Sequence, residues 1–458
     1  MNSGRLRMLL ARRMRVNHIE WTAAVGLLSQ IARPLISIIT MPVLLSDLGK
    51  EGLGLWLIAL SVIGMISFAN AGLSTSLVTA IGRASVDASD EMICRLTSCA
   101  TLIALGSGAA VAAIVLPAAL MIDWHWVLNL SSEIKPEDVT RLFVVLMAIC
   151  TFGFVAYVPR QIMIARLHGY LAYAVDLVGI VAGAGLMLFA LHLGKALWVI
   201  ALAFILPQYL ALGILGLVYL RRERIPLLSR AHIDRATLSS LGRESAKFTA
   251  YQASYAISSQ SDILLVGIVL GAPATAAYGI AQRIFSLPVL FVTAVNQALW
   301  PELARADANR EDARVARIHS RMLYLGTSAA LATALVLAFG YKLLVTLWLG
   351  RFVPTDPLIL EGMVCWVLVT SLVNTMDTLL RARLETSFIM YGMLAMAIIN
   401  ICTTLALLPI IGPAGAIWGS VTGYAVALLI PYSLKIRGQS GIARREAMVQ
   451  QTPGSSGE

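Results

Sequence analysis

The chain has few charged residues for its length. Only 13% of its 458 residues are charged and 58% are hydrophobic, whereas about 25% of the residues of a soluble domain are charged. The mean hydropathy of +0.80 therefore excludes a water-soluble domain. About 20 apolar residues cross the ~30 Å hydrocarbon core of a bilayer, and the chain has room for twelve such segments. We expect an all-α polytopic membrane protein.

Cysteine, histidine and nucleotide-binding motifs are equally scarce. The five cysteines form no Cys-x-x-Cys pair and the six histidines are scattered, so neither a disulfide framework nor a metal site is predicted. The sequence has no Gly-x-x-x-x-Gly-Lys-Ser/Thr motif, which argues against ATP hydrolysis. No catalytic group and no cofactor are expected, and coupling to H⁺ or Na⁺ is left open.

Lysine and arginine are nearly absent from one face of the predicted membrane protein. If both termini are cytoplasmic, only six of the 35 Lys and Arg residues fall on the opposite face: Lys50, Lys135, Arg141, Lys195, Lys342 and Arg351. Cytoplasmic loops carry such an excess of positive charge. The net charge of +10 is therefore a topology signal, and nucleic-acid binding is not predicted.

Three short motifs recur at nearly one offset. Ala165-Arg166-Leu167 returns 217 residues later as 382–384, the Trp of 194–198 aligns with that of 412–418 at offset 220, and Leu48-Gly49 returns at 270–271. Six helices separate the copies, so the halves have the same orientation across the membrane. The sequence predicts two parallel six-helix repeats around a central cavity.

The predicted organisation has five parts. They are a basic cytoplasmic N-terminus (1–19), a six-helix lobe (20–220), a basic cytoplasmic linker (221–245), a second six-helix lobe (246–436) and a disordered cytoplasmic tail (437–458). The last two helices are separated by a hairpin turn predicted at Pro409 to Pro413, because the uncharged stretch around it is too long for one crossing.

Arg33 is isolated in an apolar stretch, about 18 Å along the helix from Trp21. An ionised group at this depth costs about 2.5 to 3.5 kcal/mol on insertion scales and usually faces a protein interior or a hydrated cavity. Asp176 lies at a compatible depth, so a structural ion pair between the two is one interpretation. The preferred one is a cavity-lining arginine that binds an anion, since its planar fork matches phosphate oxygens.

Arg283 and Asp262 flank one predicted external hairpin at similar depth. They would form a buried ion pair that fixes two helices, or one of them would bind substrate or a proton. Among the uncharged polar residues within helices, Gln30, Asn70 and Gln297 are candidates for contacts with sugar hydroxyls. Asp262 and Asp176 are the candidates for charge balance or ion coupling.

Several segments resemble one family of membrane proteins. Residues 48–56 (Leu-Gly-Lys-Glu-Gly-Leu-Gly-Leu-Trp) and 71–74 (Ala-Gly-Leu-Ser) are similar to the first hairpin of the polysaccharide flippases, and 277–284 (Ala-Tyr-Gly-Ile-Ala-Gln-Arg-Ile) and 411–416 to later helices. This O-antigen and exopolysaccharide translocase family belongs to the multidrug/oligosaccharidyl-lipid/polysaccharide exporter superfamily. The family often has an acidic residue before the 71–73 tripeptide, where this chain has Asn70.

The resemblance implies a flippase of the bacterial inner membrane, not an enzyme. The substrate would be an oligosaccharide on undecaprenyl diphosphate, moved by alternating access for cell-surface polysaccharide biosynthesis, with Arg33 and Arg283 contacting the diphosphate or acidic sugars. Membrane lipids, a polysaccharide polymerase and export proteins would be its partners. Two alternatives stay open: a cation-coupled multidrug or small-molecule exporter of the same fold, and a membrane-embedded glycan polymerase.

Overall fold

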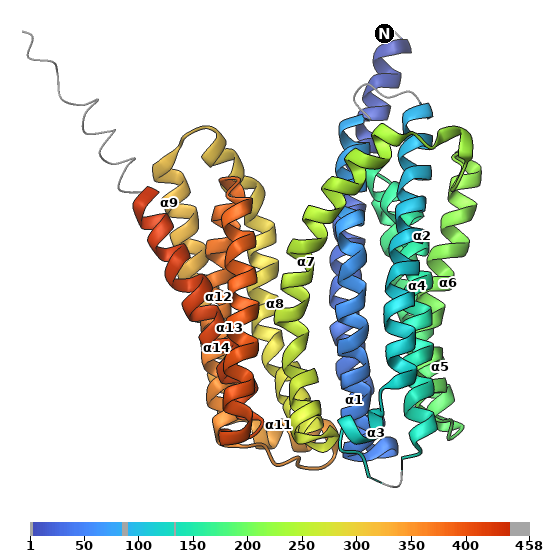
Figure 1. Cartoon of the computed structure of the whole chain (residues 1–458). Helices are drawn as coiled ribbons and strands as arrows, with labels where there is room; N and C mark the ends of the chain where they lie inside the picture. Colours follow the sequence, from blue (N-terminus) through green and yellow to red (C-terminus); the bar gives the residue numbers. More distant parts are fainter. Residues whose placement is uncertain (1–2, 85–89, 132–133, 440–458) are drawn as a thin grey trace, which may run out of the picture. The chain divides into compact units, whose positions relative to one another are not determined.

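The computed structural model describes residues 3–84, 90–131 and 134–439, and within them the side chains of most residues from Trp21 onward (Figure 1). Its longer helices are α1 (Ser3–Ala84), α2 (Asp90–Met121), α4 (Pro136–Ala165), α5 (Gly169–His192), α6 (Leu197–Arg222), α7 (Arg235–Leu270), α8 (Ala272–Ala308), α12 (Pro357–Ala382) and α13 (Thr386–Ile411). Shorter elements are α3 (Trp124–Val127), η1 (Arg230–His232), α9 (Asp312–Arg321), η2 (Met322–Gly326), α10 (Thr327–Phe339), α11 (Tyr341–Leu349), α14 (Ala414–Gly423) and η3 (Tyr424–Leu429). The described residues contain no strand.

The number of membrane crossings agrees with the prediction. Ten helical segments of the described chain are long and apolar enough to span a bilayer. The first of them divides at Gly49, whose backbone is non-helical at φ 69° and ψ −173°. The 36-residue helix α7 supplies one more crossing, with its most apolar part at 260–270. Twelve transmembrane segments result, and the all-α prediction is confirmed.

The backbone repeats wherever the predicted sequence repeat has a turn. Left-handed φ values occur in pairs, at Gly49 and Gly271 (69° and 84°), at Leu167 and Leu384 (63° and 60°), and at Gly194 and Gly412 (61° and 60°). Leucine rarely adopts this conformation, because its Cβ then approaches the following carbonyl oxygen. The Gly412 turn separates α13 from α14, so the hairpin predicted near Pro409 to Pro413 is confirmed.

Cross-links at the ends of the helices repeat as well. In the first half Arg166 forms an ion pair with Glu223 at 3.0 Å. In the second half the equivalent Arg383 donates to Gln439 at 2.7 Å. Each arginine therefore ties the turn between the fourth and fifth helices of its repeat to the end of the sixth, which supports two parallel six-helix repeats.

The described chain forms two compact units. The first runs to Ala256 and includes Gly271–Pro273, and the second contains Ile257–Leu270 and the residues from Ala274 onward. The predicted linker 221–245 contains the end of α6, the short helix η1 and the start of α7. Most of the tail predicted to be disordered, from residue 440 onward, lies outside the described residues.

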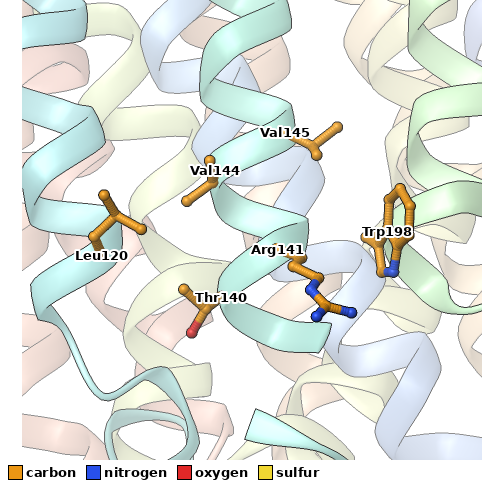
Figure 2. Close-up of a pocket in the computed structure, with 6 residues that line it drawn as sticks. All are labelled: Leu120, Thr140, Arg141, Val144, Val145 and Trp198. Carbon is orange, nitrogen blue, oxygen red and sulfur yellow. The ribbon is translucent and has the colours of Figure 1, made fainter. Parts of the chain in front are cut away.

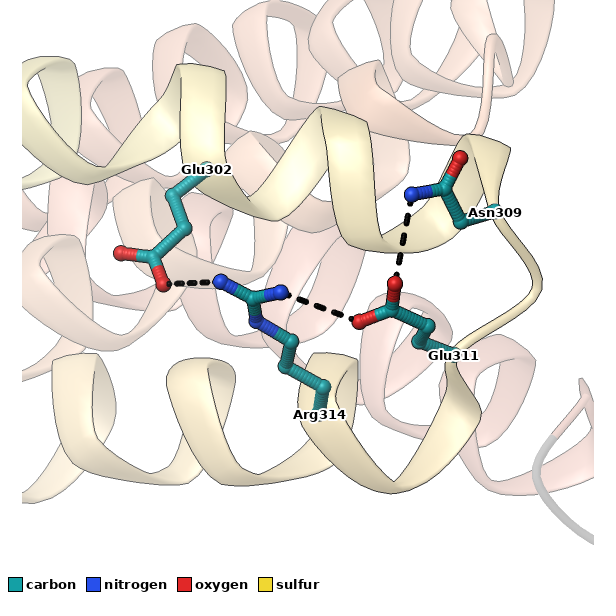
Figure 3. A network of polar contacts seen from close by, with 4 residues as sticks. All are labelled: Glu302, Asn309, Glu311 and Arg314. Carbon is teal, nitrogen blue, oxygen red and sulfur yellow. Dashed lines mark hydrogen bonds and ion pairs between the residues drawn. The ribbon is translucent and has the colours of Figure 1, made fainter.

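A polar network closes the turn between α8 and α9 in the second unit (Figure 3). Arg314 donates to Glu302 at 3.0 Å and to Glu311 at 3.1 Å, and Asn309 donates to Glu311 at 3.2 Å. These hydrogen bonds hold the pKa of the Glu311 carboxyl below its ordinary value. Because the pKa of Glu311 is lower in the folded protein than in the unfolded chain, this carboxylate contributes to folding stability at neutral pH. That contribution is lost only when acid protonates the carboxylate.

Glycines allow the helices of each unit to pack closely. In the first unit, a Cβ atom on Gly183 of α5 would lie 2.2 Å from the backbone oxygen of Phe204 on α6. In the second, a Cβ on Gly415 of α14 would lie 2.5 Å from the backbone nitrogen of Leu408 on α13. Since small residues let backbones approach within membranes, these two helix pairs depend on glycine.

Two glycines on α5 provide a matched test of this packing. Gly183→Ala should destabilise the protein by about 1 to 3 kcal/mol, because a rigid backbone atom must move to admit the methyl group. Gly185→Ala on the same helix should change little, since nothing lies within 4 Å of its added Cβ. Thermal unfolding in detergent measures both variants, and equal losses of stability would contradict the packing.

Candidate functional site

The second unit contains a fully buried carboxylate held by hydroxyl groups. Asp262 on α7 is only 4% exposed. Its Oδ2 atom accepts a hydrogen bond from the Ser420 hydroxyl at 2.6 Å and one from the Tyr278 hydroxyl at 3.2 Å. Within the described chain, no Lys, Arg or His forms an ion pair with it. Among the described residues, this carboxyl group is therefore held by hydroxyl groups and not by a basic side chain.

A second layer of polar groups surrounds this carboxylate. Asn400 lies beside Asp262 and donates through Nδ2 to the Ser420 hydroxyl at 3.1 Å. The side-chain Oδ1 atom of Asn400 accepts a hydrogen bond from the Thr404 hydroxyl at 2.9 Å. Gly419 packs directly on Thr404, so α13 and α14 come close enough for these bonds. We call Asp262, Tyr278, Asn400, Thr404 and Ser420 the Asp262 cluster.

The structure does not pair Asp262 with Arg283, and this interpretation of the sequence is wrong. Tyr278, which binds Asp262, and Arg283 are five residues apart on α8, which places them about 140° apart around an ideal helix. The pair was predicted because both residues lie at a similar depth in the membrane. Arg283, however, lies on a different face of α8 from the residue that contacts Asp262. The half-buried Arg283 has no hydrogen-bond partner for its buried Nε atom among the described residues.

The second proposed pair, between Arg33 and Asp176, is also absent. Asp176 binds Arg160 of α4, whose Nε and Nη2 atoms lie 3.0 and 2.7 Å from Oδ2. The distribution of Lys and Arg along the sequence counted Arg160 among the cytoplasmic charges, yet α4 continues past it to Ala165. Asp176 therefore balances the charge of Arg160.

Helix packing explains why Arg33 cannot replace Arg160. The Thr22 hydroxyl of α1 accepts a hydrogen bond from the backbone of Tyr170 on α5, and Gly26 packs on the ring of Tyr173. Asp176 is thus level with about residue 29. Arg33 lies roughly 6 Å farther along α1.

Arg33 is exposed and lies near an aromatic side chain. It has no ion pair or hydrogen bond among the residues that the structure describes, while its charge acts weakly on the Tyr209 phenol of α6. The Tyr209 ring packs on Gly153 and meets the Tyr157 ring at a centroid distance of 5.9 Å. The Arg33 guanidinium is therefore within electrostatic reach of the pair of rings formed by Tyr209 and Tyr157.

Arg160 extends this surface toward the end of α4. Its guanidinium carbon lies 5.6 Å from the centroid of the Tyr157 ring and 5.4 Å from that of Tyr173. The first unit thus joins Tyr209, Tyr157, Arg160 and Tyr173 in one series of ring and cation contacts, and the charge of Arg33 acts on its Tyr209 end. Of the two arginines, only Arg33 is without a carboxylate.

The other predicted contact residues differ in exposure. Gln30 is exposed and lies three residues before Arg33, so the two share a face of α1. Asn70 is buried. Gln297 is exposed on α8, while its neighbour Asn296 is buried and bonds Thr375 of α12.

Sequence reasoning missed the neutral members of both sites. Asn400 and Thr404 are four residues apart in an otherwise apolar helix, which is a signal that could have indicated them. Ser420 and the tyrosines carry no comparable pattern. Their role depends on which helices become neighbours, and the spacing of residues along one helix does not determine that.

Comparison with known proteins identifies the family. The model of the polysaccharide biosynthesis protein family matches residues 22–307. The chain belongs to this family. The MatE family model matches residues 250–405. A protein of Salmonella typhi named "Putative O-antigen transporter" is 25% identical over 311 residues, which are 65% of this chain and 67% of that protein.

Solved structures with the same fold are transporters of the MOP superfamily. An inward-facing multidrug resistance MATE transporter has a TM-score of 0.71 at 16% identity and covers 93% of this chain and 100% of its own. An outward-facing one scores 0.62 at 16% identity, with 92% and 96% covered. A MOP superfamily transporter from Pyrococcus furiosus, described as having a binding pocket of reverse polarity, has a TM-score of 0.59 at 15% identity, with 93% of this chain and 94% of that one covered.

These comparisons confirm several predictions from the sequence. The polysaccharide family is the one that the motifs resembled, the chain is a multi-pass membrane transporter, and its relatives are not enzymes. The membrane-embedded polymerase alternative therefore has no support among them. At such low identity the structural neighbours show the fold alone.

The buried pair in the first unit has a measurable role. Asp176→Asn should destabilise the protein by about 3 to 5 kcal/mol, because it leaves the Arg160 charge unpaired. Replacing both partners together, Arg160→Met with Asp176→Leu, should restore most of that loss, since no buried charge then remains. Unfolding in detergent measures the three proteins, and a double variant as unstable as Asp176→Asn would contradict this account.

Proposed function

We propose that this protein flips a lipid-linked oligosaccharide, carried on undecaprenyl diphosphate, across the bacterial inner membrane by alternating access. Its family membership and its likeness to a protein named as an O-antigen transporter support a polysaccharide substrate. The orientation with both termini in the cytoplasm, which the distribution of Lys and Arg favours, would let the substrate enter from the cytoplasmic face.

One observation carries the proposal, namely the exposed Arg33, which has no carboxylate partner in the part of the chain that the structure describes. A diphosphate cannot cross hydrocarbon unaided, and arginine stays ionised and binds phosphate oxygens with two parallel hydrogen bonds. Tyr209, on which the charge of Arg33 acts, and its neighbour Tyr157 offer ring surface in the same unit. Together these groups suit a head group that carries both phosphates and sugars.

The rival function, export of multidrug-type organic cations, fits this unit less well. A cationic substrate would meet the uncompensated charge of Arg33, and the nearby carboxylate of Asp176 is already held by Arg160. The MATE-like fold is shared by both functions. Charge, and not fold, is therefore the discriminating feature.

The Asp262 cluster is our proposed ion-coupling site, with H⁺ or Na⁺ as the coupling ion. A buried carboxylate without a cation is costly to keep ionised, so its interaction with a proton or a small cation is favourable. The carboxylate, two hydroxyls and an amide provide the oxygen ligands that hard cations prefer. The four helices α7, α8, α13 and α14 would then respond together to ion binding.

Substitution of Arg33 tests the transport proposal. Arg33→Ala should lower export about a hundredfold, since two charge-assisted hydrogen bonds contribute about 3 kcal/mol together. The export rate of Arg33→Lys should lie between that of Arg33→Ala and that of wild type. Lysine keeps the positive charge but cannot form the two parallel hydrogen bonds of the guanidinium group. The measurement is translocation of lipid-linked oligosaccharide in vesicles.

The exposed Arg222, at the end of α6, supplies the control, and Arg222→Ala should transport normally. Size-exclusion profiles should show that every variant is folded. Full transport by folded Arg33→Ala would refute the role of this residue in flipping. Transport of organic cations in place of the oligosaccharide would favour the rival function.

Asp262→Asn tests ion coupling. Wild-type protein should gain thermal stability when Na⁺ replaces choline, or show transport driven by an imposed pH gradient, because the ion binds the carboxylate. Asp262→Asn should lose whichever of these responses the wild-type protein shows, because the amide has a similar shape but no charge. Asp176→Asn, although less stable at the outset, should keep them, and a persistent ion response in Asp262→Asn would place the coupling site elsewhere.

A further inference from the structure

An apolar groove lies on the first unit, at the end that carries α3 and away from the residues discussed above. Its volume is about 190 Å³, and it is lined by Leu120, Thr140, Arg141, Val144, Val145 and Trp198. Figure 2 shows α4 between Leu120 of α2 on one side and Trp198 of α6 on the other. The Arg141 guanidinium reaches toward Trp198.

The position of the groove corresponds to the boundary between head groups and hydrocarbon. Leu120 is the penultimate residue of α2, Trp198 is the second of α6, and Arg141 lies five residues after the start of α4. Five residues correspond to about 7.5 Å of helix. Tryptophan is enriched at this level of membranes, so the groove opens where the glycerol and phosphate of a lipid would lie.

The charges at the groove have both signs and lie side by side. Arg141 donates to Glu137 at 3.2 Å and lies 3.7 Å from an oxygen of Asp138. These contacts are exposed, with 57% of the Arg141 and 79% of the Glu137 side chain accessible. Exposed ion pairs are weak and can exchange partners. A ligand with one positive and one negative group can therefore satisfy the arginine and the carboxylates together.

From this arrangement we propose that the groove binds one acyl chain of a zwitterionic aminophospholipid. The chain lies against Leu120, Val144 and Val145, the phosphate accepts from Arg141, and the primary ammonium donates to Glu137 and Asp138. A purely anionic head group would meet the two carboxylates, and a purely cationic one would meet Arg141. A quaternary ammonium has no N–H group and cannot donate to the carboxylates.

Lipid retention by the purified full-length protein tests this site. The protein is incubated with equal amounts of phosphatidylethanolamine, phosphatidylcholine and phosphatidylglycerol, and native mass spectrometry counts the lipids that remain bound. Phosphatidylethanolamine should be retained about tenfold more than phosphatidylcholine, because it alone makes charge-assisted hydrogen bonds through its amine. Equal retention of the three lipids would overturn the proposal.

Three substitutions separate the parts of the site. Val144→Trp should fill the groove and remove the preference, whereas Leu347→Trp, at an exposed position in the second unit, should retain it. Arg141→Gln should lower retention about tenfold. Glu137→Gln should shift the preference toward phosphatidylglycerol, since one repelling carboxylate is gone.

Folding and competing occupants are controlled in the same experiment. Arg141→Gln removes only exposed ion pairs, so its thermal unfolding should match wild type, and it tests the proposal even where Val144→Trp fails to fold. Unchanged retention in folded Arg141→Gln would overturn the assignment. In a second incubation that adds an equal amount of undecaprenyl phosphate, preferential retention of this lipid over phosphatidylethanolamine would also overturn the proposal, because the groove would then bind the polyprenyl chain.

Discussion

Every ionised group within the hydrocarbon layer must have a partner, a hydrated surface or a ligand, and the interior of this protein is organised by that constraint. Asp176 and Arg160 satisfy it as an ion pair with 2.7 Å between Nη2 and Oδ2. Asp262 satisfies it through hydroxyl and amide dipoles from three other helices. Arg33 is exposed and has no partner among the described residues, so a hydrated surface or a ligand is what the constraint requires for it. These three solutions have different consequences, since a paired charge holds helices together while an unpaired one remains available for binding.

Glycines at the helix contacts make these polar interactions possible. Short hydrogen bonds between helices require backbones that approach closely, and a side chain at Gly419 would prevent the contact between Asn400 and Ser420. Gly153 and Gly26 similarly receive the rings of Tyr209 and Tyr173. The polar sites and the helix packing are thus specified by the same positions, so a substitution at one of these glycines affects both.

The sequence predicted the features that depend on local composition. The twelve crossings follow from the length of apolar segments, and the repeat follows from motifs at turns, where Leu167 and Leu384 indeed share a left-handed backbone. The partners of buried charges were predicted less well. Depth along the membrane placed Asp262 beside Arg283 and Asp176 beside Arg33, but the face of each helix determines the partner, and apolar segments with weak periodicity do not reveal that face. Arg160 was missed as the partner of Asp176 because it was counted among the cytoplasmic charges, whereas α4 continues past it to Ala165.

The repeat gives the Asp262 cluster an additional meaning. The offset of 222 between the Gly49 and Gly271 turns aligns Asp262 with Thr40, a buried residue of α1. The Thr40 hydroxyl donates to the Ile36 carbonyl of its own helix at 2.8 Å and so requires nothing from its neighbours. The two halves are alike in their turns and unlike in their electrostatics. A cation that reached Asp262 would therefore interact with one half of the duplicated scaffold only, because the equivalent position in the other half has no carboxylate.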